Sequence, residues 1–133
     1  ELFPTRYLKL INQLLVQLKN SMPKEELERL LVQIAVDLSA EFAKKIKHFP
    51  MEKKLDAIRV FLAQEGYVIE WEKQNAQYVI TEITCPFYHI SQKHPEVCMI
   101  DHAIFSSLLS LPVERVKCIL TGDNHCSYLI QQN

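Results

Sequence analysis

The stretch YVIEWEKQNAQYVITEIT, residues 67–84, decides the fold class because the hydrophobic period of the chain changes there. Residues 67–72 alternate between apolar and polar side chains, and residues 77–84 are rich in β-branched and aromatic side chains, as β-strands are. Residues 73–76 between them predict a hairpin turn. Gly66 stands just before the change and suits the end of a helix.

Three amphipathic helices are predicted before this hairpin. The first covers residues 5–19, the second runs from about 23 to 48, and the third is defined by apolar residues between Leu55 and Leu62. The first helix is apolar on more than one side, through Leu8, Leu10, Ile11, Leu14, Leu15, Val16 and Leu18. A second apolar surface on a terminal helix usually packs on a partner, so we expect a homodimer through the N-terminal helices.

The elements after residue 84 complete an α+β pattern. A short helical stretch follows residue 86, a longer helix runs from Pro95 to about Leu109, and residues 113–120 and 126–130 form a second hairpin. We therefore expect a four-stranded antiparallel sheet with helices packed on one face. Residues 1–133 are interpreted as one effector domain, with a helical dimerisation arm over 1–65 and a sheet-containing ligand-binding or cluster-binding part over 66–133.

Charge and hydropathy exclude several classes of protein. The chain has 15 lysines and arginines against 16 aspartates and glutamates, so its net charge of −1 gives no basic excess for direct nucleic-acid binding. No apolar run approaches the length of a membrane span, and no signal peptide opens the chain. We expect a cytoplasmic protein without a membrane partner, in which cysteines are thiols, metal ligands or redox groups more often than disulfides.

All four cysteines lie after residue 84, at Cys85, Cys98, Cys118 and Cys126. Cys85 ends a predicted strand, and Cys98 lies in the first turn of a helix, where the helix dipole favours the thiolate. The last two lie on paired strands on either side of one turn. The strand ends and the helix start could surround a single point, and thiolate ligands suit zinc and iron–sulfur clusters.

Two interpretations of these cysteines remain open at this point. The chain has no Cys-x-x-Cys pair, so the common zinc-ribbon and zinc-finger patterns are absent. Free cysteine is among the most buried residue types, and Cys118 alternates in phase with Val116 and Leu120, which is typical of a core thiol. A metal or cluster site and a set of inert core thiols are both consistent with the spacing, and a disulfide ranks third.

Histidines offer alternative ligands. His89 and His102 each follow a cysteine by four residues, which places them on the same helix face as that cysteine, and they rank above His125. Asp101 and Asp123 could also contribute. Catalysis is poorly supported, because the chain has no nucleophile elbow, phosphate-binding loop or zinc-protease motif. We therefore expect no enzyme.

Two long stretches carry a family resemblance. They are CPFYHISQKHPEVCMIDHAIFSSLL, residues 85–109, and PVERVKCILTGDNHCSYLI, residues 112–130. The stretches LFPTRYLKLINQLLVQL, residues 2–18, and LDAIRVFLAQEGYVIEWE, residues 55–72, extend it over nearly the whole chain. Together they resemble the C-terminal effector domain of ArsR/DeoR-like transcriptional regulators, the group that includes the SufR iron–sulfur repressors.

The resemblance implies a [4Fe–4S] cluster bound through Cys85, Cys98 and Cys126, with Cys118 as the fourth ligand. It also implies that cluster state controls DNA binding by a winged-helix domain, which precedes this region in the family and is expected to be absent from this chain. The chain would then be the sensing and dimerising half of a repressor. The final hairpin also resembles vinyl-4-reductase-type domains, which implies a small-molecule ligand with structural cysteines as one alternative. A structural zinc site is another.

Overall fold

The computed structural model describes residues 5–131, so residues 1–4 and 132–133 of the predicted domain lie outside the described range. Within that range the chain forms five α-helices, two short 3-10 helices and four strands. In chain order these are α1 (Thr5–Ser21), α2 (Lys24–Lys45), α3 (Met51–Gln64), β1 (Val68–Gln74), β2 (Gln77–Thr84), α4 (Tyr88–Lys93), η1 (Pro95–Val97), α5 (Cys98–Leu109), β3 (Val113–Lys117), η2 (Ile119–Thr121) and β4 (Cys126–Ile130).

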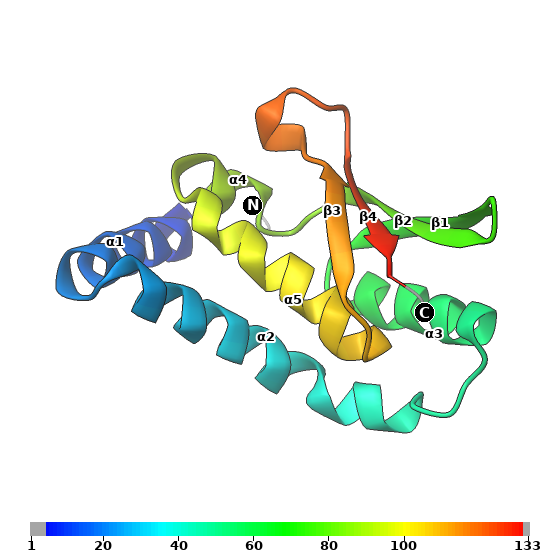
Figure 1. Ribbon diagram of the computed structural model, residues 1–133. Helices are drawn as coiled ribbons and strands as arrows, with labels where there is room; N and C mark the ends of the chain where they lie inside the picture. Colours follow the sequence, from blue (N-terminus) through cyan, green and yellow to red (C-terminus); the bar gives the residue numbers. More distant parts are fainter. Residues whose placement is uncertain (1–4, 132–133) are drawn as a thin grey trace.

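The four strands form one antiparallel sheet in the order β1-β2-β4-β3. The two hairpins therefore meet through their second strands, β2 and β4, in the middle of the sheet. Figure 1 shows the helices on one side of this sheet, with α5 between α2 and the strands. The prediction of an α+β fold with N-terminal helices and a four-stranded antiparallel sheet is confirmed.

Alternation along β2 sets the inner face of the sheet. Tyr78, Ile80 and Glu82 are buried on that face, and the residues between them are more exposed. Ile80 pairs with Tyr128 of β4, whose ring lies 4.8 Å from the ring of Phe105 on α5. The core thus joins the central strands to α5. Glu82 belongs to the same inward row, although it is acidic.

The hairpin between β1 and β2 turns through two residues, within the predicted range of 73–76. Asn75 and Ala76 both have positive φ, of 51° and 68°. Positive φ at both central positions is the geometry of a type I′ turn, which matches the right-handed twist of the flanking strands. Asparagine tolerates this region of backbone conformation, whereas alanine adopts it at a cost.

Gly66 brings the end of α3 close to the segment that follows β2. Its φ is +94°, which an L side chain rarely adopts, and a β-carbon there would lie 3.3 Å from Cβ of Pro86. The predicted helix stop at Gly66 is confirmed, because α3 ends two residues earlier. The close approach also fixes the position of Cys85, the neighbour of Pro86.

Two element boundaries differ from the prediction. Helix α2 ends at Lys45 instead of residue 48, because the chain turns there towards Pro50 and the start of α3. Strand β3 ends at Lys117 instead of residue 120. Cys118 therefore does not lie on a strand paired with that of Cys126.

The side chain of Asp123 explains the early end of β3. Its Oδ2 atom accepts a hydrogen bond from the Cys118 backbone N–H at 2.8 Å, and the Cys118 carbonyl accepts bonds from Thr121 and Asp123. These local bonds close a compact turn and compete with the sheet. A bulge at Val116 shifts the register as well, so that Val116 is 48% exposed and out of phase with the buried Cys118.

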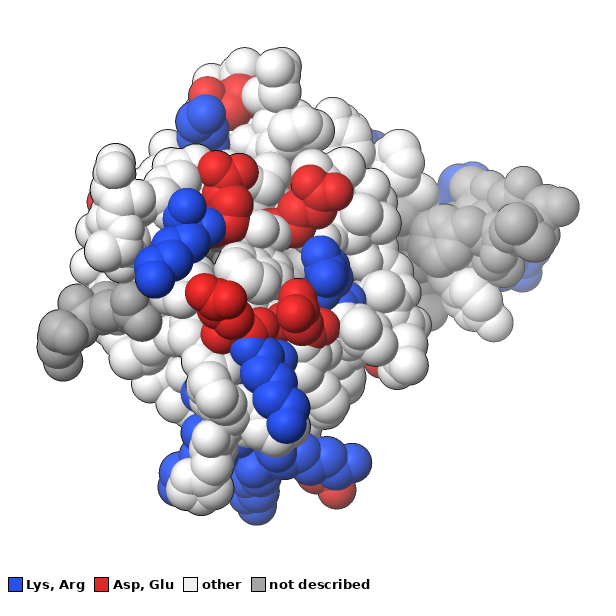
Figure 2. Space-filling view, turned by 90° about the vertical axis from the view of Figure 1, so that its right-hand side faces the viewer, with Lys and Arg blue, Asp and Glu red and all other residues white. Residues whose placement is uncertain are grey.

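Charged side chains of both signs lie on the surface. Figure 2 shows acidic and basic side chains intermixed over the middle of the face at the right of Figure 1, with basic side chains gathered at its lower edge. Over residues 5–131, none of the helices has the length and apolar character that crossing a membrane requires.

Replacing Ala76 by glycine should stabilise the protein by about 0.5–1 kcal/mol. Glycine removes a left-handed backbone cost of about 1–2 kcal/mol, and its greater freedom in the unfolded chain offsets only part of this gain. Urea unfolding followed by circular dichroism measures the change. Ala40→Gly inside α2 is the matched control, and it should instead cost about 1 kcal/mol. Equal losses in both variants would contradict the type I′ turn.

Candidate functional site

Three side chains of metal-ligand type meet between the sheet and α5. Glu82 lies on β2, Cys85 directly follows β2, and Asp101 lies on α5. One donor atom from each lies within 4.8 Å of the other two. Glu82 and Asp101 are 4% and 3% exposed, so two carboxyl groups share one nearly dry space. Such a pair is costly to ionise unless a cation or hydrogen-bond donors stabilise it.

Hydrogen bonds orient two of these three groups. The Tyr67 hydroxyl donates to Oδ1 of Asp101 at 2.9 Å, and the Cys85 thiol donates to Oδ2 of the same carboxylate at 2.9 Å. The Phe87 backbone N–H donates to Cys85 Sγ at 3.3 Å. Asp101 therefore links the start of β1, the segment after β2, and α5.

Burial dominates the protonation of the two carboxyl groups. It raises the pKa of Glu82 to about 10, with a further contribution from the charge of Asp101 and an opposing one from Arg115. Burial also raises the pKa of Asp101, although its interactions with Glu82, Cys85 and Tyr67 lower it in part. The pair therefore holds at least one proton at neutral pH when no cation is bound.

The Cys85 thiol stays protonated in the same environment. Burial raises its pKa far above the ordinary value, and the charges of Asp101 and Glu82 raise it further. The hydrogen bond from Phe87 opposes this change only in part. In the metal-free protein Cys85 is thus a hydrogen-bond donor to Asp101, and not a free thiolate.

The helix dipole, which favours a thiolate at Cys98, does not decide the protonation of this thiol. Burial and the charge of Asp101 raise the pKa of Cys98, whereas Ser91 and Arg115 lower it. A 3-10 turn, η1, precedes Cys98, so Cys98 does begin α5 as expected. The dipole of a helix end is a small effect compared with the loss of hydration.

Cys118 and Cys126 lie on either side of the η2 turn. Both are buried, and Cys126 Sγ accepts a hydrogen bond from the Ile119 backbone N–H at 3.4 Å. Burial raises the pKa of Cys126 to about 11, with a contribution from the charge of Cys118. All four cysteines are free thiols in the structure.

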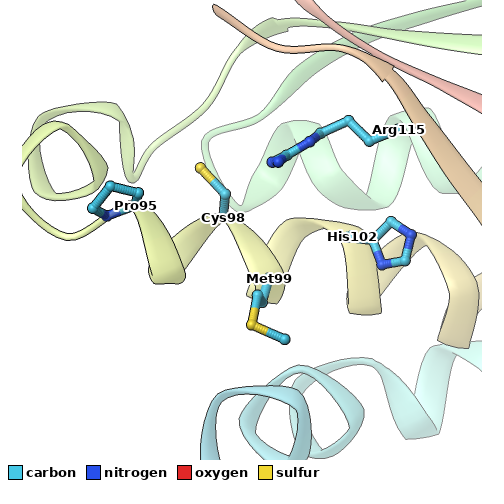
Figure 3. A pocket seen from close by; sticks show the side chains of 5 residues that line it. All are labelled: Pro95, Cys98, Met99, His102 and Arg115. Atoms are coloured by element: carbon cyan, nitrogen blue, oxygen red, sulfur yellow. The ribbon is translucent and has the colours of Figure 1, made fainter. Parts of the chain in front are cut away.

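The pKa of Arg115 on β3 is affected by several of the cysteines. Burial lowers the pKa of its guanidinium group, but nearby acidic groups outweigh this effect and raise it. In order of effect, these groups are Cys118, Tyr128, Cys98 and Cys126. Figure 3 shows the Cys98 sulfur and the Arg115 guanidinium pointing into the same space above α5. That space is a cavity of about 340 Å³, which His102 also lines.

A second, smaller cavity reaches the carboxyl group of Glu82. Its volume is about 150 Å³, and its lining includes Glu82, Cys85, Tyr88 and Cys126. Glu82 and Cys126 are directly opposite in the register of β2 and β4, so their side chains leave the same face of the sheet. Cys85 and Cys126 therefore line one cavity and Cys98 the other, whereas Cys118 lines neither. Only Cys85 belongs to the group with the two carboxyl side chains.

The three alternative histidine ligands lie apart from the carboxylates. His89 on α4 is exposed, and His125 is exposed on the outer face of the sheet, where it lines a separate cavity with Asp123. His102 Nε2 lies 2.6 Å from the Val113 carbonyl oxygen, which holds its ring against the start of β3. None of the three belongs to the group formed by Glu82, Cys85 and Asp101.

The patterns in the sequence do not point to Glu82, Arg115 or Tyr67 as site residues. A signal for Glu82 was present, because residues 78, 80 and 82 alternate in one phase and the third is a carboxylate on an otherwise apolar face. Arg115 and Tyr67 had no comparable signal. Their roles depend on the packing of β3 and β1 against α5, which the linear pattern does not contain.

Glu82→Gln should stabilise the metal-free protein at pH 8 by roughly 1–3 kcal/mol, because the buried amide, unlike the carboxyl group, stays uncharged without binding a proton. Because burial raises the pKa of Glu82, the folded protein keeps a proton that the unfolded chain releases above its ordinary value. Wild-type stability should therefore fall as the pH rises from about 4.5 towards 10, and the variant should show a smaller fall. Urea unfolding at pH 5 and pH 8 measures this.

The exposed Glu70 of β1 provides the control for that measurement. Glu70→Gln should leave both the stability and its pH dependence nearly unchanged, since an exposed carboxyl is hydrated in both states. If Glu82→Gln proved less stable than the wild type at pH 8, the buried carboxyl would be a stabilising partner and not an unsatisfied one.

Comparison with known proteins supplies a family for this chain. The model of the family described as Methanogen output domain 1 matches residues 9–131. No curated protein matches the chain. The match covers every strand, the cysteines and both carboxylates of the site. The chain belongs to the Methanogen output domain 1 family.

Proposed function

We propose that this chain is the regulatory domain of a dimeric transcriptional regulator, in which an iron–sulfur cluster bound by cysteines controls DNA binding by another domain. Membership of a family of output domains supports a regulatory role. The observation that carries the cluster proposal is the placement of Cys85 and Cys126 on one cavity, and of Cys98 with the Arg115 guanidinium on another. The resemblance to SufR-like repressors is part of the same proposal.

The donor chemistry of the site fits such a group. Thiolates are the usual ligands of iron–sulfur clusters, and the four thiols come from the segment after β2, the start of α5 and the two sides of η2. A cluster with four thiolate ligands is anionic, and the Arg115 guanidinium can offset part of that charge. Cluster binding must displace the thiol protons, because the pKa values of Cys85, Cys98 and Cys126 are raised.

A route from the site to α1 supports the regulatory role. Glu96 in η1 lies two residues before Cys98, and its Oε1 atom is 2.8 Å from Nζ of Lys19 on α1. A group bound at Cys98 would therefore restrain the same turn that contacts α1. A bound cluster would supply a change of charge, or would be lost altogether. The residues between Cys98 and α1 would pass this change on through a shift in their positions.

The dimer is proposed through α1, which is apolar on two sides. Leu15 is buried against the rest of the domain, with Leu8 and Leu18 partly buried beside it. The outer side exposes Tyr7, Leu10, Ile11 and Leu14, with exposed fractions from 41% to 60%. Spacings of three and four residues make this stripe complementary to a second copy of itself across a twofold axis.

Leu14→Glu should weaken a dimer by at least about tenfold, because it places a charge in the apolar stripe. Gln13→Glu is the matched control, since it adds the same charge to the neighbouring position of α1, outside the stripe. Light scattering over a range of micromolar concentrations measures the change. A wild-type protein that stays monomeric throughout, or equal weakening by both variants, would contradict the proposed interface.

Anaerobic reconstitution with iron and sulfide should give a coloured protein with bound iron and sulfide in comparable amounts. Cys98→Ser should lose most of the colour, whereas an inert core thiol would tolerate the change. Met99→Leu is the matched control. Met99 also lines the cavity, but its sulfur is a thioether, and its side chain leaves α5 on the side opposite to the Cys98 sulfur in Figure 3. A colourless wild-type product without iron would reject the cluster.

A small-molecule-binding regulatory domain is the second candidate. The observation that favours it is a mostly apolar cavity of about 240 Å³ between α2, α3 and α5, lined by Leu38, Phe61, Tyr67, Phe87 and Ile104 among others. This candidate predicts binding of an apolar ligand that Ile104→Trp abolishes while cluster reconstitution is unaffected. A structural zinc site, in contrast, would give one zinc ion per chain and no colour.

A further inference from the structure

The meeting point of Glu82, Cys85 and Asp101 contains an unpartnered buried oxygen. Oε2 of Glu82 is inaccessible to solvent and has no hydrogen-bond partner in the described part of the chain. Glu82 as a whole is 4% exposed, and one donor atom of each of the three residues lies within 4.8 Å of the others. An unsatisfied buried oxygen of this kind is rare in folded proteins.

Protein groups within residues 5–131 do not neutralise this acidic pair by direct contact. Arg115 lowers the pKa of both Glu82 and Asp101, so its positive charge is felt there. However, Arg115 forms no ion pair or hydrogen bond with either carboxylate in that range. A divalent cation between the carboxylates would remove their repulsion and would give Oε2 of Glu82 a partner.

The surrounding hydrogen bonds resemble the outer shell of a metal site. Ligating carboxylates and thiolates in proteins are usually held by further hydrogen bonds that fix their direction. Here the Tyr67 hydroxyl holds Oδ1 of Asp101 and leaves Oδ2 facing Cys85. The Phe87 backbone N–H holds Cys85 Sγ on the other side. These groups preorganise one oxygen and one sulfur toward a common point.

Access and room are also present. The cavity of about 150 Å³ reaches both Glu82 and Cys85, so it provides a path and a position for a water ligand. On binding, the Cys85 thiol and the Glu82–Asp101 pair would each release a proton to solvent. Sγ of Cys85 and Oδ2 of Asp101 would then turn from each other to the ion. The hydrogen bond between Cys85 and Asp101 would be replaced by two metal–ligand bonds, one from each residue.

We propose that, in the cluster-free protein, Glu82, Cys85 and Asp101 bind a single divalent transition-metal ion, zinc or ferrous iron. One thiolate and two carboxylates suit ions of borderline softness, whereas calcium and magnesium prefer oxygen ligands alone. The site goes beyond the proposed cluster and shares only Cys85 with it. A cluster and a single ion therefore exclude each other at that thiol.

Anaerobic titration of the metal-free chain with cobalt(II) tests this site directly, because cobalt reports its ligands by absorption. The wild type should bind one cobalt ion with a sulfur-to-cobalt charge-transfer band, and zinc should displace it. Glu82→Gln and Asp101→Asn should each weaken binding by at least about tenfold. Cys85→Ser should lose the charge-transfer band. Glu70→Gln, on the exposed side of β1, should behave as the wild type.

Thermal unfolding controls for damage to the fold. Zinc should raise the midpoint of the wild type and of Glu70→Gln, because it binds only the folded state. The midpoint of Cys85→Ser should not respond, even if the variant is folded in its circular dichroism spectrum. Absence of a charge-transfer band in the wild type, or unchanged cobalt affinity in both carboxylate variants, would overturn the proposal.

Different variants should abolish the single-ion site and the cluster, so the two proposals can be tested separately. Cys98→Ser should lose the cluster after reconstitution but should still bind cobalt through the other three residues. Glu82→Gln should keep the cluster colour and lose tight cobalt binding. If Cys98→Ser lost cobalt binding, the ion would be bound by the cysteines. That result would overturn its assignment to Glu82, Cys85 and Asp101.

Discussion

The buried carboxylate of Asp101 holds the helical layer and the sheet together at one point. It accepts hydrogen bonds from Tyr67, just before β1, and from Cys85, just after β2, and it belongs to α5. A buried carboxylate is tolerated only where donors replace the water it has lost. The hydrogen bonds of this one carboxylate therefore tie both ends of the β1–β2 hairpin to α5. The positions of the other thiols depend on that arrangement of the hairpin and α5.

Much of the architecture is readable from residues 67–84 and the helical stripes before them. The turn, the helix stop at Gly66 and the length of β2 follow from local preferences that the tertiary structure does not oppose. The second hairpin was predicted less well. There the Asp123 side chain bonds to the Cys118 backbone and closes a turn, and a pattern of apolar residues alone does not reveal such a bond.

The sequence predicts the cysteines of the site but not its carboxylate Glu82. Cysteines attract notice because they are few, whereas Glu82 is one of many acidic residues, and its importance depends on which face of β2 is covered. Cys98 shows a different limit of the sequence. The position of Cys98 at a helix start is a local property, whereas its pKa is governed by burial and by Asp101, one helical turn away in the same helix.

The donor atoms of the site come from β2, the segment after it, α5 and β4, so no short peptide of this chain contains the complete set. A zinc knuckle can collect its metal while the chain is still being synthesised, because its ligands are neighbours in sequence. Here β4 is made last and must insert between β2 and β3 before Cys126 faces Glu82. Any group that requires these side chains together can be loaded only after β4 has paired with both of its neighbours.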